Sequence, residues 1–204
     1  MIAAPPPGVV LALRRGDEVP PLAAAEADAI ADAAPIRRAE FARGRACAHA
    51  ALRTLGHDRA VIARAPSRAP VWPPGVVGSI THCAGLAAAA VATTAILRGL
   101  GLDAEPNQPL PPEVVPTVLV AAERAWLAAA PAGAIAWDRL LFSIKESVYK
   151  AQHPLTARWL DFPDVTVAID PTTATFVATG IDAPAIRGSY GADAAHVMTL
   201  AWID

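Results

Sequence analysis

The order of the predicted secondary-structure elements constrains the fold of this chain most. Segments with helical periodicity are followed by segments with the two-residue alternation of strands, and this order occurs twice. In chain order the segments are a strand at 9–13, a helical region at 23–55, strands between 78 and 106, helices at 114–130 and 137–153, and strands from 164 to the C-terminus. The repeated order predicts an α+β protein made of two halves, residues 1–101 and 102–204.

Prolines mark the expected breaks between these segments. Pro35 interrupts the first helical region, and we expect Pro131 and Pro154 to end the two later helices. Four prolines within 66–74 predict an extended loop around Trp72, because proline fixes φ and cannot continue a helix.

Composition and charge exclude several classes of protein. A net charge of −2 over 204 residues argues against a globally basic nucleic-acid binder. The longest apolar run, Leu86–Leu97, is shorter than the about 20 residues of a membrane span. The arginines of the N-terminus follow its apolar residues, which is the reverse of a secretory signal. Cys47 and Cys83 match no metal-ligand spacing. We therefore expect a cytoplasmic protein with reduced thiols that binds neither nucleic acid nor membrane.

The strand LGLDAE carries two carboxylates on one face. Because side chains alternate along a strand, Asp103 and Glu105 point one way while Leu100, Leu102 and Ala104 point the other. Like charges at this spacing repel unless a cation lies between them, and their hard oxygens suit Mg²⁺. Taken alone, such a pair is more often solvated surface.

The helical segment LFSIKESVYK gathers charges on one face. At 100° per residue, one arc contains Phe142, Lys145, Glu146, Tyr149 and Lys150. A surface ion pair between the glutamate and the lysine four residues later would explain two of the charges. The second lysine and the two flanking aromatic rings favour a phosphate site instead.

The strand GSITHC supplies a third polar segment. His82 is preceded by Ser79 and Thr81, but no acidic partner stands nearby in the sequence and no GxSxG motif is present. A structural histidine is the commoner case for a lone histidine on a strand. A contact to phosphate is also compatible with the segment.

These segments together resemble a known enzyme family. GVVGSITHC, LGLDAEP and LLFSIKESVYK, in this order, resemble the three motifs of the 4′-phosphopantetheinyl transferases of the Sfp type, and within it the enterobactin-synthetase-activating and mycobacterial branch. The resemblance extends to RRAEFARGRACAHAALRTLG, PVWPPG and PLTARWLDF, and so covers roughly residues 35–165. Each motif alone is weak, but the three in order are specific.

The resemblance implies a reaction and a fold. The family transfers the phosphopantetheine arm of coenzyme A to a serine of an apo carrier protein and releases 3′,5′-ADP. Its fold is a pseudo-dimer of two similar α+β subdomains with the active site in the cleft between them. We therefore expect coenzyme A as substrate, Mg²⁺ or Mn²⁺ as metal, and an acyl or peptidyl carrier protein as partner. A monomer suffices, because one chain supplies both halves.

The resemblance also implies roles for the charged residues of the second half. Asp103, Glu105 and Glu146 would hold the metal, and Lys145 and Lys150 would contact the diphosphate of coenzyme A. The catalytic residues would be Glu146, Lys150 and Asp103, with the glutamate as general base as well as ligand. The carrier is expected near the segment 109–120.

Basic residues of the first half would bind the other end of coenzyme A. Arg37 and Arg45, eight residues apart on one helical face, and Arg64 are the expected contacts of its 3′-phosphate. The segment GSITHC would add Ser79, Thr81 and His82 to the coenzyme A site, with Arg68 as a weaker candidate and Pro70 and Trp72 beside the adenine.

Two other functions stay open on the sequence alone. A magnesium-dependent phosphohydrolase acting on coenzyme A or a nucleotide diphosphate would use the same carboxylates and lysines. A non-catalytic coenzyme A binding module would keep the arginines but would not need all three carboxylates. The sequence does not say which carrier protein or pathway is served.

Overall fold

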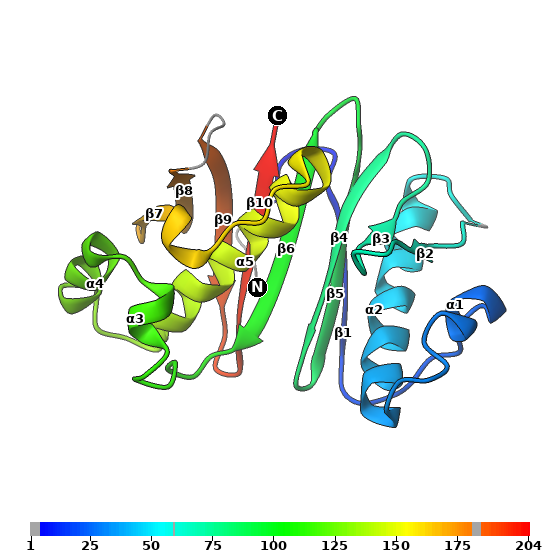
Figure 1. Cartoon of the computed structure of the whole chain (residues 1–204), viewed down its shortest axis with the longest axis horizontal. Helices are drawn as coiled ribbons and strands as arrows, with labels where there is room; N and C mark the ends of the chain where they lie inside the picture. The colour runs from blue at the N-terminus through cyan, green and yellow to red at the C-terminus, as the bar shows by residue number, and fades with distance from the viewer. Residues whose placement is uncertain (1–4, 59, 181–184) are drawn as a thin grey trace.

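The structure is a computed structural model that describes residues 5–58, 60–180 and 185–204. Two β-sheets lie face to face at the centre, and one long helix covers the outer face of each (Figure 1). The protein is therefore of the α+β class, as the order of the predicted elements indicated. No helix in these described ranges combines the length and the apolar run that crossing a membrane requires.

The first half contains an antiparallel sheet of order β1-β5-β4, with α2 on its outer face. Its elements are β1 (Val10–Arg15), α1 (Ala24–Asp28), α2 (Pro35–Thr54), β2 (Ala63–Arg64), β3 (Pro70–Val71), β4 (Val76–Cys83) and β5 (Leu86–Thr93). Strand β5 is buried on both faces: Ala87, Ala89 and Val91 pack towards α2, while Ala88 and Ala90 face the second sheet. Its small side chains allow a helix and a sheet to approach the same strand closely.

The second half contains a five-stranded antiparallel sheet of order β6-β10-β9-β8-β7. Its elements are β6 (Gly99–Pro106), α3 (Val115–Val118), α4 (Ala121–Ala128), α5 (Trp137–Thr156), the 3₁₀ helix η1 (Phe162–Asp164), β7 (Thr166–Asp170), β8 (Thr175–Thr179), β9 (Ile186–Ala192) and β10 (His196–Ile203). The predicted boundary between residues 101 and 102 lies within β6.

Strand β9 lies in the C-terminal region predicted to form strands, but no individual strand was predicted at residues 186–192. Its glycines lower the strand signal, but Gly188 has a packing reason: a Cβ there would lie 2.0 Å from the ring of Phe176 and 2.5 Å from the carbonyl oxygen of Leu200. A glycine in this strand therefore marks close packing.

Two predicted helix boundaries are wrong. The segment 114–130 forms two helices, because the carboxylate of Glu123 accepts a hydrogen bond from the nitrogen of Val120 and so starts α4 anew. Helix α5 continues past Pro154 to Thr156, and its last turn is closed by a hydrogen bond from the nitrogen of Ala157 to the carbonyl of His153, 2.9 Å long. A proline so close to the helix end removes little hydrogen bonding.

Helix α5 packs tightly on β6. A Cβ at Gly101 would lie 1.8 Å from the carbonyl oxygen of Ser147, so no larger residue fits there. The neighbouring residues on the same side of β6 are Asp103 and Glu105, whose side chains therefore project beside α5. Leu100 and Leu102 on the other side lie in the core between the sheets, as the strand alternation predicted.

Side chains join the two halves along β4 and β6. The hydroxyl of Ser79 donates to the carbonyl of Leu102 (3.4 Å), and the nitrogen of Ala104 donates to the hydroxyl of Thr81 (3.1 Å). At one end of the sheets Arg15 pairs with Asp193 at 2.5 Å. These contacts cross from one half to the other and fix β4 beside β6.

Candidate active site

Asp103 lies at the centre of the contacts between β4, β6 and α5. Its carboxylate is buried and accepts hydrogen bonds from Lys150 (2.6 Å) and Ser143 (2.8 Å) on α5, and a longer one from Thr81 (3.3 Å) on β4. The hydroxyl of Thr199 on β10 lies 3.0 Å from that of Ser143. Three elements therefore fix one carboxylate.

Ser143 and Thr199 were not predicted for the site. Ser143 stands three residues before Glu146 in LFSIKESVYK, but a serine inside a helix gives no signal of its own. Thr199 pairs with Asp103 in the β10–β6 ladder, which only the sheet register reveals.

Glu105 is held by an arginine from α5. Arg139 donates to its carboxylate at 3.2 Å and to the backbone carbonyl of Gln108 at 3.1 Å. Burial, followed by the charge of Asp103, raises the pKa of Glu105, and Arg139 and Lys150 oppose this. Arg139 was not predicted as a site residue.

Glu146 is the third carboxylate of the cluster. Burial raises its pKa first, the charge of Asp103 raises it further, and Lys150 lowers it. The charges of Asp103 and Lys150 thus act on both Glu105 and Glu146, although β6 and α5 are far apart in the sequence.

The three carboxylates have the oxygen chemistry that Mg²⁺ prefers. Burial is the first cause of the raised pKa values of Glu105 and Glu146, and repulsion from Asp103 is the second; a divalent cation between the carboxylates would relieve that repulsion. As the side chains stand, however, Lys150 and Arg139 hold two of them, and no three acidic, histidine or cysteine side chains among the described residues converge on one point. A metal here would displace existing cations from the carboxylates.

Lys145 does not join this cluster. Its ammonium is buried and contacts Glu123 at 2.8 Å and the backbone carbonyls of Val118 and Phe162. Burial lowers the pKa of Lys145, and the hydrogen bond that its ammonium donates to Glu123 opposes the shift. The sequence had placed Lys145 and Lys150 on one helical arc, but in the structure they bind different carboxylates.

A small cavity in the first half is lined mainly by cationic side chains. It has a volume of about 120 Å³, and its charged or titratable lining residues are Arg37, Arg45, Arg64, Arg68 and His82. Four of them are the first-half cations predicted from the sequence, with Arg68 as the weaker candidate. The eight-residue spacing of Arg37 and Arg45 does place both on the same cavity.

Arg45 is the most firmly held of these cations. Its guanidinium lies 4.6 Å from the centre of the Phe41 ring, 4.0 Å from a carboxylate oxygen of Glu26, and donates to the carbonyl of Ala63. Its Nε is buried without a hydrogen-bond partner within the described chain. Burial lowers the pKa of Arg45, but an arginine remains charged.

His82 contributes a neutral ring to the same cavity. Burial, followed by the charge of Arg37, lowers its pKa, and Glu40 opposes the shift. Arg37 donates to its Nε2, which leaves the ring proton on Nδ1, 3.7 Å from Glu40.

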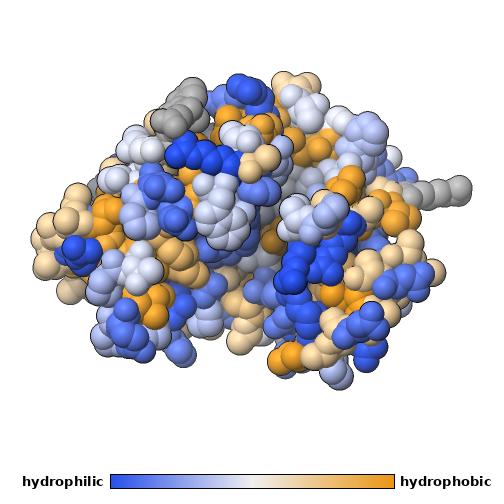
Figure 2. Space-filling model, viewed as in Figure 1, coloured by the Kyte–Doolittle hydropathy of each residue, from blue (hydrophilic) through white to orange (hydrophobic). Residues whose placement is uncertain are grey.

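A second cavity adjoins this basic cavity and extends to Lys150, whose ammonium binds Asp103. It has a volume of about 310 Å³, shares Arg68 and Pro70 with the first, and reaches Lys150 and Tyr149 on α5; Trp72 and Ser79 also line it. Figure 2 shows this face hollowed between the halves, with strongly hydrophilic side chains on the side where Figure 1 has α2, β2 and β3. The cavities form one cleft that both halves line.

A third cavity, of about 210 Å³, lies beside Glu146. Its other lining residues are largely aromatic or apolar and come from α5 and the loop after it: Lys145, Tyr149, Trp159, Leu160, Asp161, Phe162 and Val165. This cavity can take an uncharged chain next to a carboxylate.

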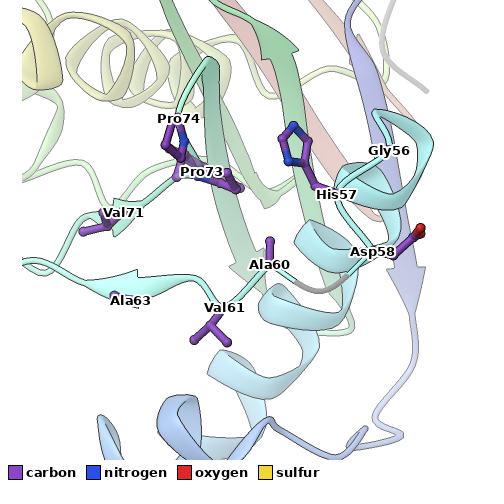
Figure 3. A pocket seen from close by; sticks show the side chains of 10 residues that line it. Gly56, His57, Asp58, Ala60, Val61, Ala63, Val71, Pro73 and Pro74 are labelled. Carbon is purple, nitrogen blue, oxygen red and sulfur yellow. The ribbon is translucent and has the colours of Figure 1, made fainter.

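Another hollow, of about 650 Å³, lies away from this cleft. Figure 3 shows it between the end of α2, where the ring of His57 stands, and the turn at Pro73 and Pro74. Its lining contains Asp58 but no lysine or arginine, so among the described residues it offers no cation for a phosphate.

Comparisons with known proteins assign both halves of the chain to the same family. Residues 25–92 match the model of the 4′-phosphopantetheinyl transferase N-terminal domain, and residues 99–201 match that of the 4′-phosphopantetheinyl transferase superfamily.

Three characterised relatives are similar over most of the chain. The 4′-phosphopantetheinyl transferase Svp of Streptomyces mobaraensis is 51% identical over 155 residues, covering 75% of this chain and 63% of the relative. The transferase Npt of Nocardia iowensis is 45% identical, covering 72% and 65%. The transferase PptT of Mycobacterium tuberculosis is 40% identical, covering 80% and 72%. The chain thus spans less than two thirds of the length of the first two.

Proposed function

Because the chain belongs to the 4′-phosphopantetheinyl transferase superfamily, we propose that it transfers the 4′-phosphopantetheine arm of coenzyme A to a serine hydroxyl of an apo carrier protein. The observation that carries the proposal is the cleft between the halves, which has arginines at one end and, at the other, Lys150, whose ammonium binds the carboxylate of Asp103. Coenzyme A has a matching layout, with a 3′-phosphate at one end and a diphosphate before its uncharged arm.

The basic cavity is the proposed site of the 3′-phosphate. Guanidinium groups bind phosphate through charge-assisted hydrogen bonds in a planar fork. The exposed end of Arg37 supplies donors, and Arg45 lines the same cavity. Arg64 and His82 complete the proposed contacts, and Trp72 in the adjoining cavity offers a ring for the adenine.

The carboxylates are the proposed metal site. Asp103, Glu105 and Glu146 would hold Mg²⁺, or Mn²⁺, which when bound neutralises charge on the departing 3′,5′-ADP. Ser143 and Thr81 hold Asp103 in place. Lys150, which already donates to Asp103, is the proposed diphosphate contact. Lys145 has three close acceptors of its own, so we do not place it on the phosphates.

Glu146 is the proposed general base. A carboxylate with a raised pKa accepts a proton more readily than an ordinary glutamate, which suits the deprotonation of a serine hydroxyl. The serine oxygen then bonds to the phosphorus that carries the arm. The bond between that phosphorus and the bridging oxygen breaks, and 3′,5′-ADP leaves with the electron pair.

The apolar cavity beside Glu146 is the proposed place for the arm. The pantetheine arm is uncharged and carries methyl groups and two amides, which suits walls made of Tyr149, Trp159 and Leu160. The carrier is proposed to approach along 109–120, where Pro112, Glu113 and Thr117 are exposed while Val118 and Leu119 are buried. A monomer working in the cytoplasm stays a prediction.

The test is transfer to a panel of apo carrier proteins in the presence of coenzyme A and Mg²⁺. Intact-protein mass spectrometry should show the mass gain of the phosphopantetheine arm on at least one carrier, and none when a chelator removes the metal. A parallel reaction without carrier should leave coenzyme A intact. Hydrolysis in that reaction together with unmodified carriers would support a phosphohydrolase and overturn the proposal. Coenzyme A binding without transfer or hydrolysis would indicate a binding module.

A further inference from the structure

The chain contains only two lysines, Lys145 and Lys150, although its lysines and arginines together number 17. Both stand on α5, at positions 145 and 150. A chain that uses arginine for every other strong cation has a chemical reason for lysine at these two positions, and the structure shows a different reason for each.

The ammonium of Lys145 has three N–H donors and three close acceptors. It donates to Val118 at 2.8 Å and to Phe162 at 2.9 Å, both through backbone carbonyls, and pairs with Glu123 at 2.8 Å. Its side chain is only 1% exposed. Every donor is therefore used, and the planar fork of an arginine cannot direct its N–H groups to three acceptors around one point.

The partner carboxylate is just as fully engaged. Glu123 also accepts hydrogen bonds from the nitrogens of Val120 and Val167, at 2.9 and 2.8 Å. Through this one pair α5 is tied to the end of α3, the start of α4, η1 and the start of β7. The Lys145–Glu123 pair therefore connects these segments to α5.

Lys150 presents the contrast. It donates to Asp103 and to the carbonyl of Leu102, and its side chain remains 29% exposed. Among the described residues these two acceptors leave one N–H of Lys150 for a ligand in the cleft.

The Lys145–Glu123 pair lies next to the wall of the apolar cavity beside Glu146. Phe162, whose carbonyl accepts from Lys145, lines that cavity together with Trp159 and Leu160 from the same loop, and Glu146 lines the opposite side from α5. Holding Phe162 to α5 therefore fixes the width of the cavity next to the proposed base.

We propose that Lys145, paired with Glu123, is a positioning residue that holds the loop 159–165 against α5 and so shapes the cavity for the uncharged arm of coenzyme A. This rests on the proposed function. It assigns to Lys145 no contact with phosphate, in contrast to Lys150.

The test compares binding of two ligands that share their phosphates at the nucleotide end. Coenzyme A carries the arm, whereas 3′-phosphoadenosine 5′-diphosphate keeps the same three phosphates and lacks only the arm. Calorimetric affinities of both ligands should be measured, with Mg²⁺ present, for the wild type, Lys145→Met, Lys145→Arg, Lys150→Met and the double variant Lys145→Met/Glu123→Gln. Thermal unfolding of each variant reports its stability.

We expect Lys145→Met and Lys145→Arg to weaken coenzyme A at least about tenfold and 3′-phosphoadenosine 5′-diphosphate less than about twofold. The double variant leaves no unpaired buried charge, so it should recover most of the thermal stability lost by Lys145→Met, yet keep the selective loss of coenzyme A. Lys150→Met, the matched control, should weaken both ligands.

The other outcomes overturn the inference. Equal weakening of both ligands by Lys145→Met would make Lys145 a phosphate contact, as would full rescue by arginine. An unchanged ratio of the two affinities in the double variant would reduce the pair to a stabilising one. If the wild type binds neither ligand, the proposed function fails and the positioning role fails with it; binding by the wild type separates the two cases.

Discussion

The two halves of the cleft hold their charges in different ways. In the first half Arg45 is fixed by a ring, a backbone carbonyl and a distant carboxylate, and its charge does not titrate. In the second half Asp103 and Glu105 are bound by cations of their own half, and the charge of Asp103 raises the pKa of both Glu105 and Glu146. The first half thus presents an arginine of constant charge, whereas the second presents carboxylates whose protonation depends on their neighbours.

The largest expected effect comes from the second half. Glu146→Gln keeps the shape of the side chain but removes the proposed base, so turnover should fall by roughly 10²–10⁴-fold. Affinity for coenzyme A should change little. The measurement is the initial rate of carrier modification, with Glu18→Gln as a matched control on an exposed glutamate outside the cleft. Turnover within a few fold of wild type would remove the base role.

The next effect belongs to the first half. Replacing Arg37 and Arg45 together with alanine should weaken coenzyme A about 100-fold, because charge-assisted contacts to the 3′-phosphate are lost. Dephospho-coenzyme A, which lacks that phosphate, should be affected far less. Calorimetry with both ligands checks this. Arg53→Ala, on the last turn of the same helix and away from the cavity, is the control. Equal losses for both ligands would show that these arginines do not read the 3′-phosphate.

A smaller effect should separate a metal ligand from a base. Asp103→Asn removes one charge from the carboxylate cluster, so the Mg²⁺ concentration for half-maximal activity should rise about tenfold, with recovery of turnover as metal is added. The same magnesium titration of Glu146→Gln should show no such recovery. If Asp103→Asn needs no more metal than wild type, the carboxylate is not a ligand.

The smallest effect is on stability against pH. Burial and Asp103 raise the pKa of Glu146, so the folded protein holds that proton more tightly than the unfolded chain. The free energy of unfolding of the metal-free protein should therefore fall as pH rises above about 4.3, the usual pKa of glutamate, through the raised pKa. Denaturant unfolding between pH 4 and 8 should show a smaller fall for Glu146→Gln. Identical pH profiles for variant and wild type would contradict the raised pKa.

Part of the cleft was predictable because the periodicity of a single strand or helix determines which of its side chains share a face. Strand alternation placed Asp103 and Glu105 on one side of β6, and helical periodicity placed Arg37 and Arg45 on one cavity. The α+β class followed from the order of helices and strands.

Other features depend on contacts between distant segments, which periodicity does not contain. Lys145 and Lys150 share a helical arc, but only the packing of α4 shows that Glu123 binds the first of them. The hydroxyls of Ser79 and Thr81, predicted for coenzyme A, bond to β6 across the boundary between the halves. In the sequence, Gly188 argues against a strand at β9. Only the fold shows that the ring of Phe176 leaves no room for a larger residue there.

The division of labour between the halves can be tested in one set of rate measurements. The turnover number and the Michaelis constant for coenzyme A should be measured with one apo carrier for wild type, Arg37→Ala/Arg45→Ala and Glu146→Gln. We expect the arginine variant to raise the Michaelis constant about 100-fold while keeping most of the turnover at saturating coenzyme A, and Glu146→Gln to lose turnover with a nearly unchanged Michaelis constant. A loss of turnover in the arginine variant as large as that in Glu146→Gln would contradict the separation of binding in one half from reaction in the other.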